Sequence, residues 1–221
     1  MLNLSNTTLL TITSVNFDEH IASLEKSMCH VNFNKVVFAS HEMPNNLPKG
    51  IIWQNTHEKL DFKQYSKYCI YNMTNHVDTD FCLLVQHDSW ILRPDLWTDD
   101  FFNYDYIGAP WPLSHNAYID PFGNHIRVGN GGFSLRSKKL LEVPKYIDIP
   151  FEVNQGNFYK HMNANCYNED GNICVHNRHL YEKMGCVFPP VEIAAKFSTE
   201  TNVPETVKSF GFHKKLPFWA K

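Results

Sequence analysis

The chain has 221 residues, of which 43% are hydrophobic and 14% aromatic, so it is long enough to bury a substantial core. Its 20 basic and 23 acidic residues give a formal net charge of −3 and are mixed along the sequence. The absence of a Lys/Arg block argues against nucleic acid as a partner. No apolar run approaches the ~20 residues that span a bilayer, so no transmembrane segment is expected.

The first ninety residues alternate between predicted strands and predicted helices. Apolar residues at Phe17, Ile21, Leu24 and Met28 have helical spacing. The full set of expected elements is strands over 9–15, 35–40, 50–55 and 81–86 and helices over 17–28 and 61–74. This order predicts an α/β fold with a mostly parallel central sheet flanked by helices. No repeat or low-complexity linker divides the chain, so a single domain over 1–221 is expected.

The stretch DFCLLVQHDSWILRPDLW contains the strand expected over 81–86, followed at once by polar residues. In open α/β sheets, ligands bind in the crevice at the carboxyl ends of the strands. His87 and Asp88 would therefore face a cleft, where the Asp88 carboxylate is suited to Mg²⁺ or Mn²⁺. The alternative is that Asp88 only caps the turn after the strand.

The stretch VGNGGFSLRSKKLL carries Gly129, Gly131 and Gly132 ahead of a short predicted strand. Glycine permits positive φ and close approach of the backbone to a ligand, although many glycine-rich turns are only turns. A helix is expected to begin at Arg136. The G-x-x-x-x-G-K-[ST] pattern of a phosphate loop is absent.

The stretch NEDGNICVHNRHLYEK places Glu169 and Asp170 ahead of a predicted helix. Acids at this position interact favourably with a helix dipole, and one of them could equally act as a general base. Near the C-terminus, SFGFHK contains His213, a candidate metal ligand among twelve histidines, most of which need no functional role.

Six cysteines without a C-x-x-C pair are expected to be reduced thiols. The N-terminal stretch lacks the basic region and cleavage site of a signal peptide. Together these features predict a cytoplasmic protein.

Taken in order, these stretches resemble the GT-A-fold glycosyltransferases, which have a Rossmann-like nucleotide-diphospho-sugar transferase fold. Several strings more closely resemble a family of small proteins described as glycosyltransferases. The strings are TNHVDTDFCLLVQHDSWILRPDLW, YDYIGAPWP, VGNGGFSLRSKKLL, EDGNICVHNRHLYEKMG, FSTE and SFGFHK, and they cover about two thirds of the chain. The resemblance implies a nucleotide-binding half over 1–100 and an acceptor and catalytic half over 101–221.

The resemblance also assigns a metal site. Asp88 lies where the GT-A enzymes have the last acid of their Asp-x-Asp motif, and Gln86 stands in place of the first acid. His213 matches the C-terminal histidine that completes the metal site in many members. The implied cofactors are Mn²⁺ or Mg²⁺ and a nucleotide-sugar donor, with a uridine diphosphate (UDP) sugar favoured.

Further roles follow by position. Gly131 and Gly132 match the glycines that line the donor sugar and acceptor, and Glu169 or Asp170 matches the base of inverting members. Trp111 is a candidate for stacking on a sugar ring, or else a core residue. Arg127 is a candidate phosphate ligand, or else a solvent-exposed arginine, in a polar loop over 112–127 that is expected near the acceptor.

The favoured function is thus a metal-dependent glycosyltransferase, hexosyltransferase-like, that moves a sugar to a hydroxyl of a glycan or other acceptor. The acid pair favours inversion of the anomeric carbon. The alternative is a non-catalytic nucleotide- or carbohydrate-binding module on the same fold, supported by the missing first acid. A phosphoester hydrolase ranks last, since its denser cluster of His and Asp ligands is absent. Because the chain is short for the fold, other domains of a longer protein are a further expected partner.

Overall fold

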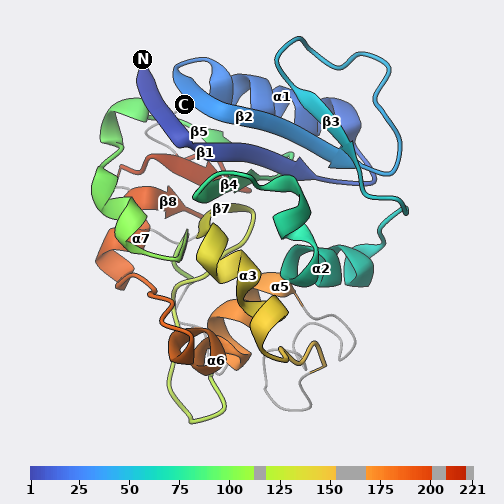
Figure 1. Ribbon diagram of the computed structural model, residues 1–221. Helices are drawn as coiled ribbons and strands as arrows, with labels where there is room; N and C mark the ends of the chain where they lie inside the picture. Colours follow the sequence, from blue (N-terminus) through green and yellow to red (C-terminus); the bar gives the residue numbers. More distant parts are fainter. Residues whose placement is uncertain (112–117, 153–167, 201–207, 218–221) are drawn as a thin grey trace.

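The structure is a computed structural model that describes residues 1–111, 118–152, 168–200 and 208–217 (Figure 1). The strands are β1 Leu2–Ile12, β2 Val31–Ser40, β3 Ile52–Asn55, β4 Phe81–Val85, β5 Ser89–Ile91, β6 Tyr106–Gly108, β7 Phe133–Ser137, β8 Ser198–Thr199 and β9 Gly211–His213. The α-helices are α1 Phe17–Met28, α2 Phe62–Tyr71, α3 Lys138–Tyr146, α5 Glu169–Gly171, α6 Arg178–Lys183 and α7 Val191–Phe197. Three short 3₁₀ turns cover Met73–His76, Pro94–Leu96 and Asp99–Asn103, and a π-helical turn covers Asn172–His176.

The central sheet has six strands in the order β3-β2-β1-β4-β7-β6. The pairs β1–β2, β1–β4 and β2–β3 are parallel, whereas β7 is antiparallel to both β4 and β6. The chain runs outward from β1 through β2 to β3 and then crosses back to β4. This makes the carboxyl ends of β1 and β4 the switch point at which open α/β sheets bind ligands. A second, smaller sheet has the order β5-β9-β8.

Neighbouring residues of the inner strands point to opposite faces of the sheet, as the period of two requires. Leu9 and Leu83 join the core on the α1 side, while Leu10 and Leu84 join the core on the side of α2 and α3. All four side chains are fully buried. The sheet is therefore the middle layer of three, with α1 on one face and α2 and α3 on the other (Figure 1). This confirms the α/β fold with a central, mostly parallel sheet.

Local sequence fixes several boundaries. Asp61 and Gln64 form a capping box at the start of α2. Ser137 caps α3 by accepting a hydrogen bond from the Leu140 N–H, so the strand extends two residues beyond the expected 133–135 before the helix begins. The helix expected after Asn168 is divided into α5, a π-helical turn and α6.

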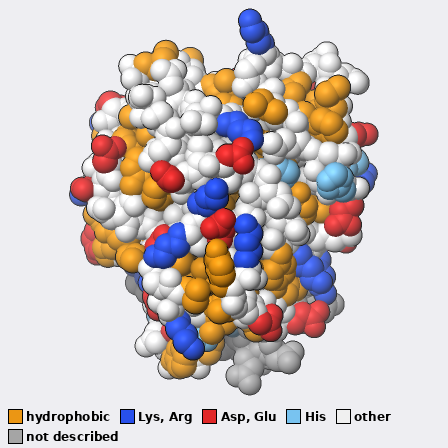
Figure 2. Space-filling view, viewed as in Figure 1, with side chains coloured by type: hydrophobic (Ala, Val, Ile, Leu, Met, Phe, Trp, Pro, Cys, Tyr) orange, Lys and Arg blue, Asp and Glu red, His pale blue; other side chains and the backbone are white. Residues whose placement is uncertain are grey.

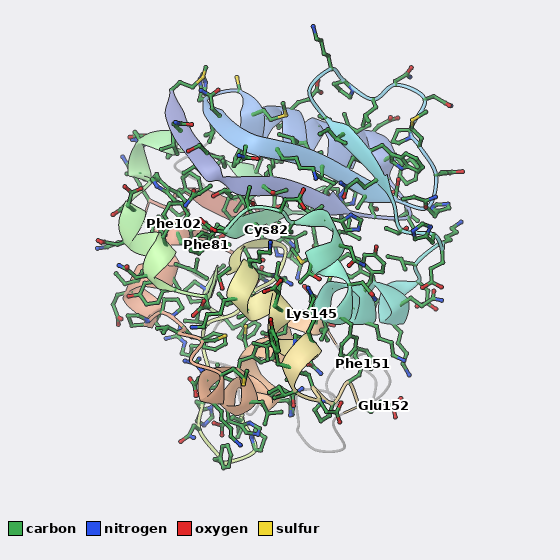
Figure 3. The ribbon with its side chains drawn as sticks, viewed as in Figure 1. Phe81, Cys82, Phe102, Lys145, Phe151 and Glu152 are labelled. Carbon is green, nitrogen blue, oxygen red and sulfur yellow. The ribbon has the colours of Figure 1, made fainter. Side chains whose placement is uncertain are left out.

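On the face in Figure 2, basic and acidic side chains are interspersed. Where β4 begins, the ring of Phe81 packs on Phe102, with centroids 4.5 Å apart, and Figure 3 shows the two residues side by side. None of the helices in the described ranges is long and apolar enough to cross a membrane.

Candidate active site

The sheet brings two distant stretches together at one edge. The last residue of β4, Val85, pairs with Phe133, the first residue of the antiparallel β7. The residues that follow β4 therefore adjoin those that precede β7, and the Gln86 N–H donates to the Gly132 carbonyl at 3.0 Å. The strand end and the glycine turn, which the sequence placed some forty residues apart, form one site.

A cavity of about 350 Å³ opens at this edge, and we call it the Asp88 cavity. It collects eight of the nine residues that the sequence singled out for a site. The eight are His87, Asp88, Trp111, Gly131, Gly132, Glu169, Asp170 and His213.

Arg127 is the ninth, and it lies elsewhere. It lines a different cavity of about 450 Å³ together with Arg178 and His179, and its Nε donates to the Trp111 carbonyl at 3.2 Å. Arg127 is therefore not among the residues that line the Asp88 cavity. Residues 112–117 of the expected acceptor loop lie outside the described residues.

The small sheet brings His213 to Asp88. β5 and β9 are antiparallel with Ser89 opposite His213, and the Lys214 N–H donates to the Asp88 carbonyl at 3.0 Å. Nε2 of His213 lies 3.4 Å from Oδ1 of Asp88. Asp88 Oδ1 is buried and lacks a hydrogen-bond partner within the described chain. An orphaned carboxylate oxygen facing an imidazole nitrogen is an arrangement that suits a shared cation.

Two further charged residues adjoin this pair. Glu200 lies 3.5 Å from His213 Nδ1 and 3.0 Å from Lys214 Nζ. The side chain of Glu200 is 7% exposed, whereas that of Lys214 is 59% exposed and stands at the mouth of the cavity. Lys214 also has a left-handed backbone, with φ of +65°. Glu200 thus anchors His213 and Lys214 around the Asp88 carboxylate.

The mutual attraction of these groups decides their charges. Burial disfavours ionised Asp88, but the attraction of His213 outweighs it and lowers the pKa of Asp88. Burial likewise disfavours protonated His213, but Asp88 and Glu200 together raise its pKa. For Lys214, the attraction of Glu200 outweighs partial burial and raises the pKa. In each case a neighbour of opposite charge favours the charged form of the group.

The glycines of the turn are required by close packing. A Cβ on Gly131 would lie 2.4 Å from Oε1 of Glu169, and a Cβ on Gly132 would lie 2.2 Å from Nε2 of His213. Among Gly129, Gly131 and Gly132, only Gly129 has positive φ, at +151°. Gly131 and Gly132 thus allow the acid pair and His213 to approach the backbone, in addition to any room they leave for a ligand.

The two neighbouring acids have different environments. Glu169 is 5% exposed and accepts a hydrogen bond from Nη2 of Arg136 at 3.0 Å. Arg136 is fully buried and also donates to the Ser134 hydroxyl and, at 3.4 Å, to the Tyr106 hydroxyl. Its charge and bonds compensate the buried carboxylate of Glu169, which is the condition for keeping an ion pair in a core.

Among the residues that the structure describes, none bonds a cationic side chain to Asp170. Its two oxygens accept hydrogen bonds from the backbone N–H groups of Gly131, at 3.0 Å, and Gly171, at 2.7 Å. Burial, assisted by the negative charge of Glu169, raises the pKa of Asp170 to about 7. A buried carboxyl group poised near neutrality in a cleft has the properties of a general base.

Trp111 and His87 both line the Asp88 cavity but differ in exposure. Trp111 is 3% exposed, and its ring stacks on Tyr118 with centroids 4.2 Å apart and planes at 3°. The Trp111 ring thus packs mainly against other side chains, which agrees with the interpretation of Trp111 as a core residue. His87 is more exposed and contacts the ring of His20, with centroids 5.4 Å apart.

A second cavity of about 400 Å³ lies at the end of β1, and we call it the β1 cavity. It is continuous in its lining with the Asp88 cavity, since both include Phe62, Tyr65, Gln86 and His87. Its remaining lining comes from the end of β1, the turn after it, His20 on α1, and the two residues before α2. Sequence reasoning did not identify this cavity, although the switch point of an α/β sheet predicts where it lies.

Three functional candidates were missed by sequence reasoning. Glu200 and Lys214 stand in the quoted strings FSTE and SFGFHK, and Lys214 directly follows His213. Arg136 gave no signal, because an arginine after FSL reads equally as a surface residue at a helix start. Only the full burial of Arg136 beside Glu169 reveals its role.

Comparison with known structures identifies the fold. The chain matches LgtC in the structure of an active-site mutant with a TM-score of 0.52 at 12% identity, covering 98% of this chain and 88% of that one. A structure of the galactosyltransferase LgtC with donor and acceptor sugar analogues gives a TM-score of 0.49 at 12% identity, with the same coverage. The glycosyltransferase GlyE of Streptococcus pneumoniae gives 0.44 at 12% identity, covering 96% of this chain and 55% of that one. The likeness to LgtC shows the GT-A fold.

Sequence comparison then places the chain in a family. Residues 55–218, about three quarters of the chain, match the family described as "Protein of unknown function (DUF5672)", and the chain belongs to that family. No curated protein matches the chain in sequence. The matched residues include both the Asp88 cavity and the strings on which the resemblance rested.

Proposed function

We propose that this protein is a glycosyltransferase that moves a sugar from a nucleotide-diphosphate donor, with a UDP-sugar as the favoured donor, to a hydroxyl of a glycan or other acceptor. One observation carries the proposal on top of the fold. The Asp88–His213 pair, the glycine turn and an acid pair converge on one cavity, and that cavity adjoins the β1 cavity at the switch point. Such an arrangement supplies separate places for a nucleoside, a diphosphate and a reacting hydroxyl.

The donor would lie across both cavities. We assign the nucleoside to the β1 cavity and the diphosphate to the side of the Asp88 cavity near Asp88, His213 and Lys214. The exposed ammonium of Lys214 is suited to a phosphate oxygen, because it is a strongly charged donor at the mouth of the cavity. The ion pair with Glu200 holds that ammonium in place.

A divalent cation is compatible with the residues present. No group of three His, Cys, Asp or Glu side chains in the described ranges is placed to hold a metal ion. Mg²⁺ is nevertheless commonly bound through one or two protein ligands, with water and substrate phosphates completing its shell. Asp88, through its orphaned Oδ1, and His213 would hold such an ion. The ion would supply positive charge that offsets the charge developing on the diphosphate leaving group.

Asp170 is the candidate base. In the proposed step its carboxylate accepts the proton of the acceptor hydroxyl, the hydroxyl oxygen bonds to the anomeric carbon, and the bond from that carbon to the diphosphate oxygen breaks with its electron pair. Displacement from the opposite face inverts the anomeric carbon. Glu169 is the less suitable base, because Arg136 already holds it in a buried ion pair. Its proposed role is to support the base by keeping the Asp170 carboxyl easily protonated.

The first test is a calorimetric titration with UDP, with and without Mn²⁺, on the native protein and on Asp88→Ala. Binding that requires Mn²⁺ and is lost in Asp88→Ala supports the donor site. The matched control is Asp95→Ala, since Asp95 is exposed and forms an ion pair with Arg93 away from the cavity. Equal binding without metal would contradict the metal-assisted mechanism, and absence of binding would contradict the UDP donor.

A non-catalytic binding module is the second candidate. Gln86 replaces the first acid of the metal motif, and its amide donates to the Tyr65 hydroxyl at 3.0 Å instead of offering a carboxylate. Slow hydrolysis of UDP-sugars by the protein alone distinguishes the two. An enzyme releases UDP over hours, whereas a binding module releases none while binding UDP normally.

A further inference from the structure

The β1 cavity contains a histidine whose hydrogen bonding fixes its chemical state. Thr11 Oγ1 donates to the Val85 carbonyl at 2.8 Å, and it also lies 2.7 Å from Nδ1 of His20. A hydroxyl has a single proton, so the second contact requires a proton on Nδ1 of His20, which donates to Thr11 Oγ1. The Thr11 side chain thereby selects the Nδ1–H tautomer.

The other ring nitrogen of His20 is consequently an acceptor. Burial, assisted by the nearby positive charge that His87 can carry, lowers the pKa of His20 to about 3, so the ring is neutral near pH 7. Nε2 has no hydrogen-bond partner among the residues that the structure describes, and it is not among their fully buried, unpartnered atoms. His20 lines the β1 cavity, and because Nδ1 is engaged by Thr11, Nε2 is the ring nitrogen left to bond a ligand there.

A donor and apolar surfaces accompany this acceptor. Ser14 Oγ accepts a hydrogen bond from the Leu60 N–H at 2.8 Å, which leaves the hydroxyl proton of Ser14 available to the cavity it lines. Phe62 and Val15 also line the cavity and are 53% and 59% exposed. A flat ring can cover apolar side chains of this kind while its edge pairs with polar atoms.

We propose that His20 is a specificity-determining residue that selects a nucleobase with a ring N–H beside a carbonyl, through an N–H to Nε2 hydrogen bond, with Ser14 donating to the carbonyl. Uracil and guanine carry this edge. Cytosine and adenine present an unprotonated ring nitrogen there, which would face Nε2 acceptor to acceptor. The inference rests on the proposed function, since it names the base of the proposed nucleotide donor.

The discriminating probe is 3-methyl-UDP, in which a methyl group replaces the ring proton. Titrations on the native protein compare UDP, 3-methyl-UDP, GDP and CDP in the presence of Mn²⁺. UDP is expected to bind about tenfold or more tightly than 3-methyl-UDP and CDP, because both leave Nε2 unpaired. The titration of the native protein with GDP decides whether guanine, which presents the same N–H and carbonyl edge as uracil, is also selected.

Variants then locate the effect at His20. In His20→Ala the preference for UDP over 3-methyl-UDP is expected to disappear, with UDP itself weakened about three- to tenfold. His30→Ala is the control, since His30 is an exposed histidine outside the cavity lining. Thermal unfolding of both variants is measured alongside, because His20 is buried. The native-protein comparison stands whether or not His20→Ala folds.

The outcomes separate the inference from the function beneath it. If UDP binds and 3-methyl-UDP or CDP binds equally well, the role of His20 is overturned while the donor site stands. If no nucleoside diphosphate binds with or without Mn²⁺, the proposed function itself fails. A preference for UDP that persists unchanged in a folded His20→Ala also overturns the assignment.

Discussion

The two cavities differ in the kind of polar group that they contain. The β1 cavity is lined mainly by neutral groups such as His20, Ser14 and Gln86, whose hydrogen bonds have fixed directions. The Asp88 cavity is lined by charged residues held by partners of opposite sign or by backbone N–H groups. Neutral directional groups suit recognition, whereas charges in a buried site suit the stabilisation of a reaction. The difference predicts that changes in the two cavities will separate binding from turnover.

The largest effect on turnover is expected from Asp170→Asn. This nearly isosteric change removes the base, although its amide NH2 cannot accept one of the two backbone N–H bonds that the carboxylate accepts. We expect transfer or donor hydrolysis to fall about 10²–10⁴-fold. UDP affinity, measured by calorimetry, should change less than about threefold. The comparison is made on initial rates with a UDP-sugar panel. An unchanged rate would remove Asp170 from the mechanism.

The second prediction concerns the buried ion pair between Arg136 and Glu169. Arg136→Met leaves Glu169 as an unpaired buried charge, and we expect the free energy of unfolding to fall by about 3–5 kcal/mol in urea denaturation. Adding Glu169→Gln to Arg136→Met should recover part of this loss, because the uncompensated charge is then gone. Lys145→Met serves as the control, since its pair with Glu142 is half-exposed. An equal loss of unfolding free energy in Arg136→Met and Lys145→Met would contradict the role of Arg136 as the buried partner of Glu169.

Gly132→Ala should affect only the charged cavity. The added Cβ would meet the His213 ring, so the ring must move away from Asp88. We expect Mn²⁺-dependent UDP affinity to weaken about tenfold, in line with the usual effect of disturbing a metal ligand's surroundings. Gly123→Ala controls for backbone strain, since Gly123 has φ of +88° and open space around it. Equal affinity in Gly132→Ala would place His213 outside the nucleotide site.

The smallest expected effect is a pH-dependent difference in Tm between Asp170→Asn and the native protein. The pKa of Asp170 is raised to about 7 in the folded protein, while an unfolded aspartate has a pKa near ~4. Between these values the folded state holds the extra proton, so the Asp170 contribution to stability falls as pH rises through this window and stays low above it. The Tm of Asp170→Asn relative to that of the native protein should therefore be about 2 °C or more higher at pH 8 than at pH 5, because the loss of one backbone hydrogen bond in the variant does not depend on pH.

The same titration should appear in turnover. The base form of Asp170 grows as pH rises, so kcat/KM of the native protein should increase through the region near pH 7. A flat profile across that region would contradict an essential base with a raised pKa.

The sequence determined much of the framework. The apolar spacing of Phe17 to Met28 predicted α1 with its observed bounds, and the α/β alternation predicted the sheet class. Local periodicity carries this information, because a helix or strand must bury one face whatever its neighbours are. Eight of the nine named site residues also line one cavity, since strand ends and glycine turns are predictable meeting points in this fold.

Tertiary structure alone decided the chemistry within that framework. Glu169 and Asp170 are adjacent and equivalent in the sequence, and only the buried Arg136 on β7 makes one an ion-pair partner and the other a candidate base. Arg127 faces a different cavity, although nothing in its local sequence says so. The neutral tautomer of His20 likewise depends on Thr11 and Val85, which stand on two different strands. Charge state and hydrogen-bond direction arise from partners distant in the chain, and no local pattern encodes them.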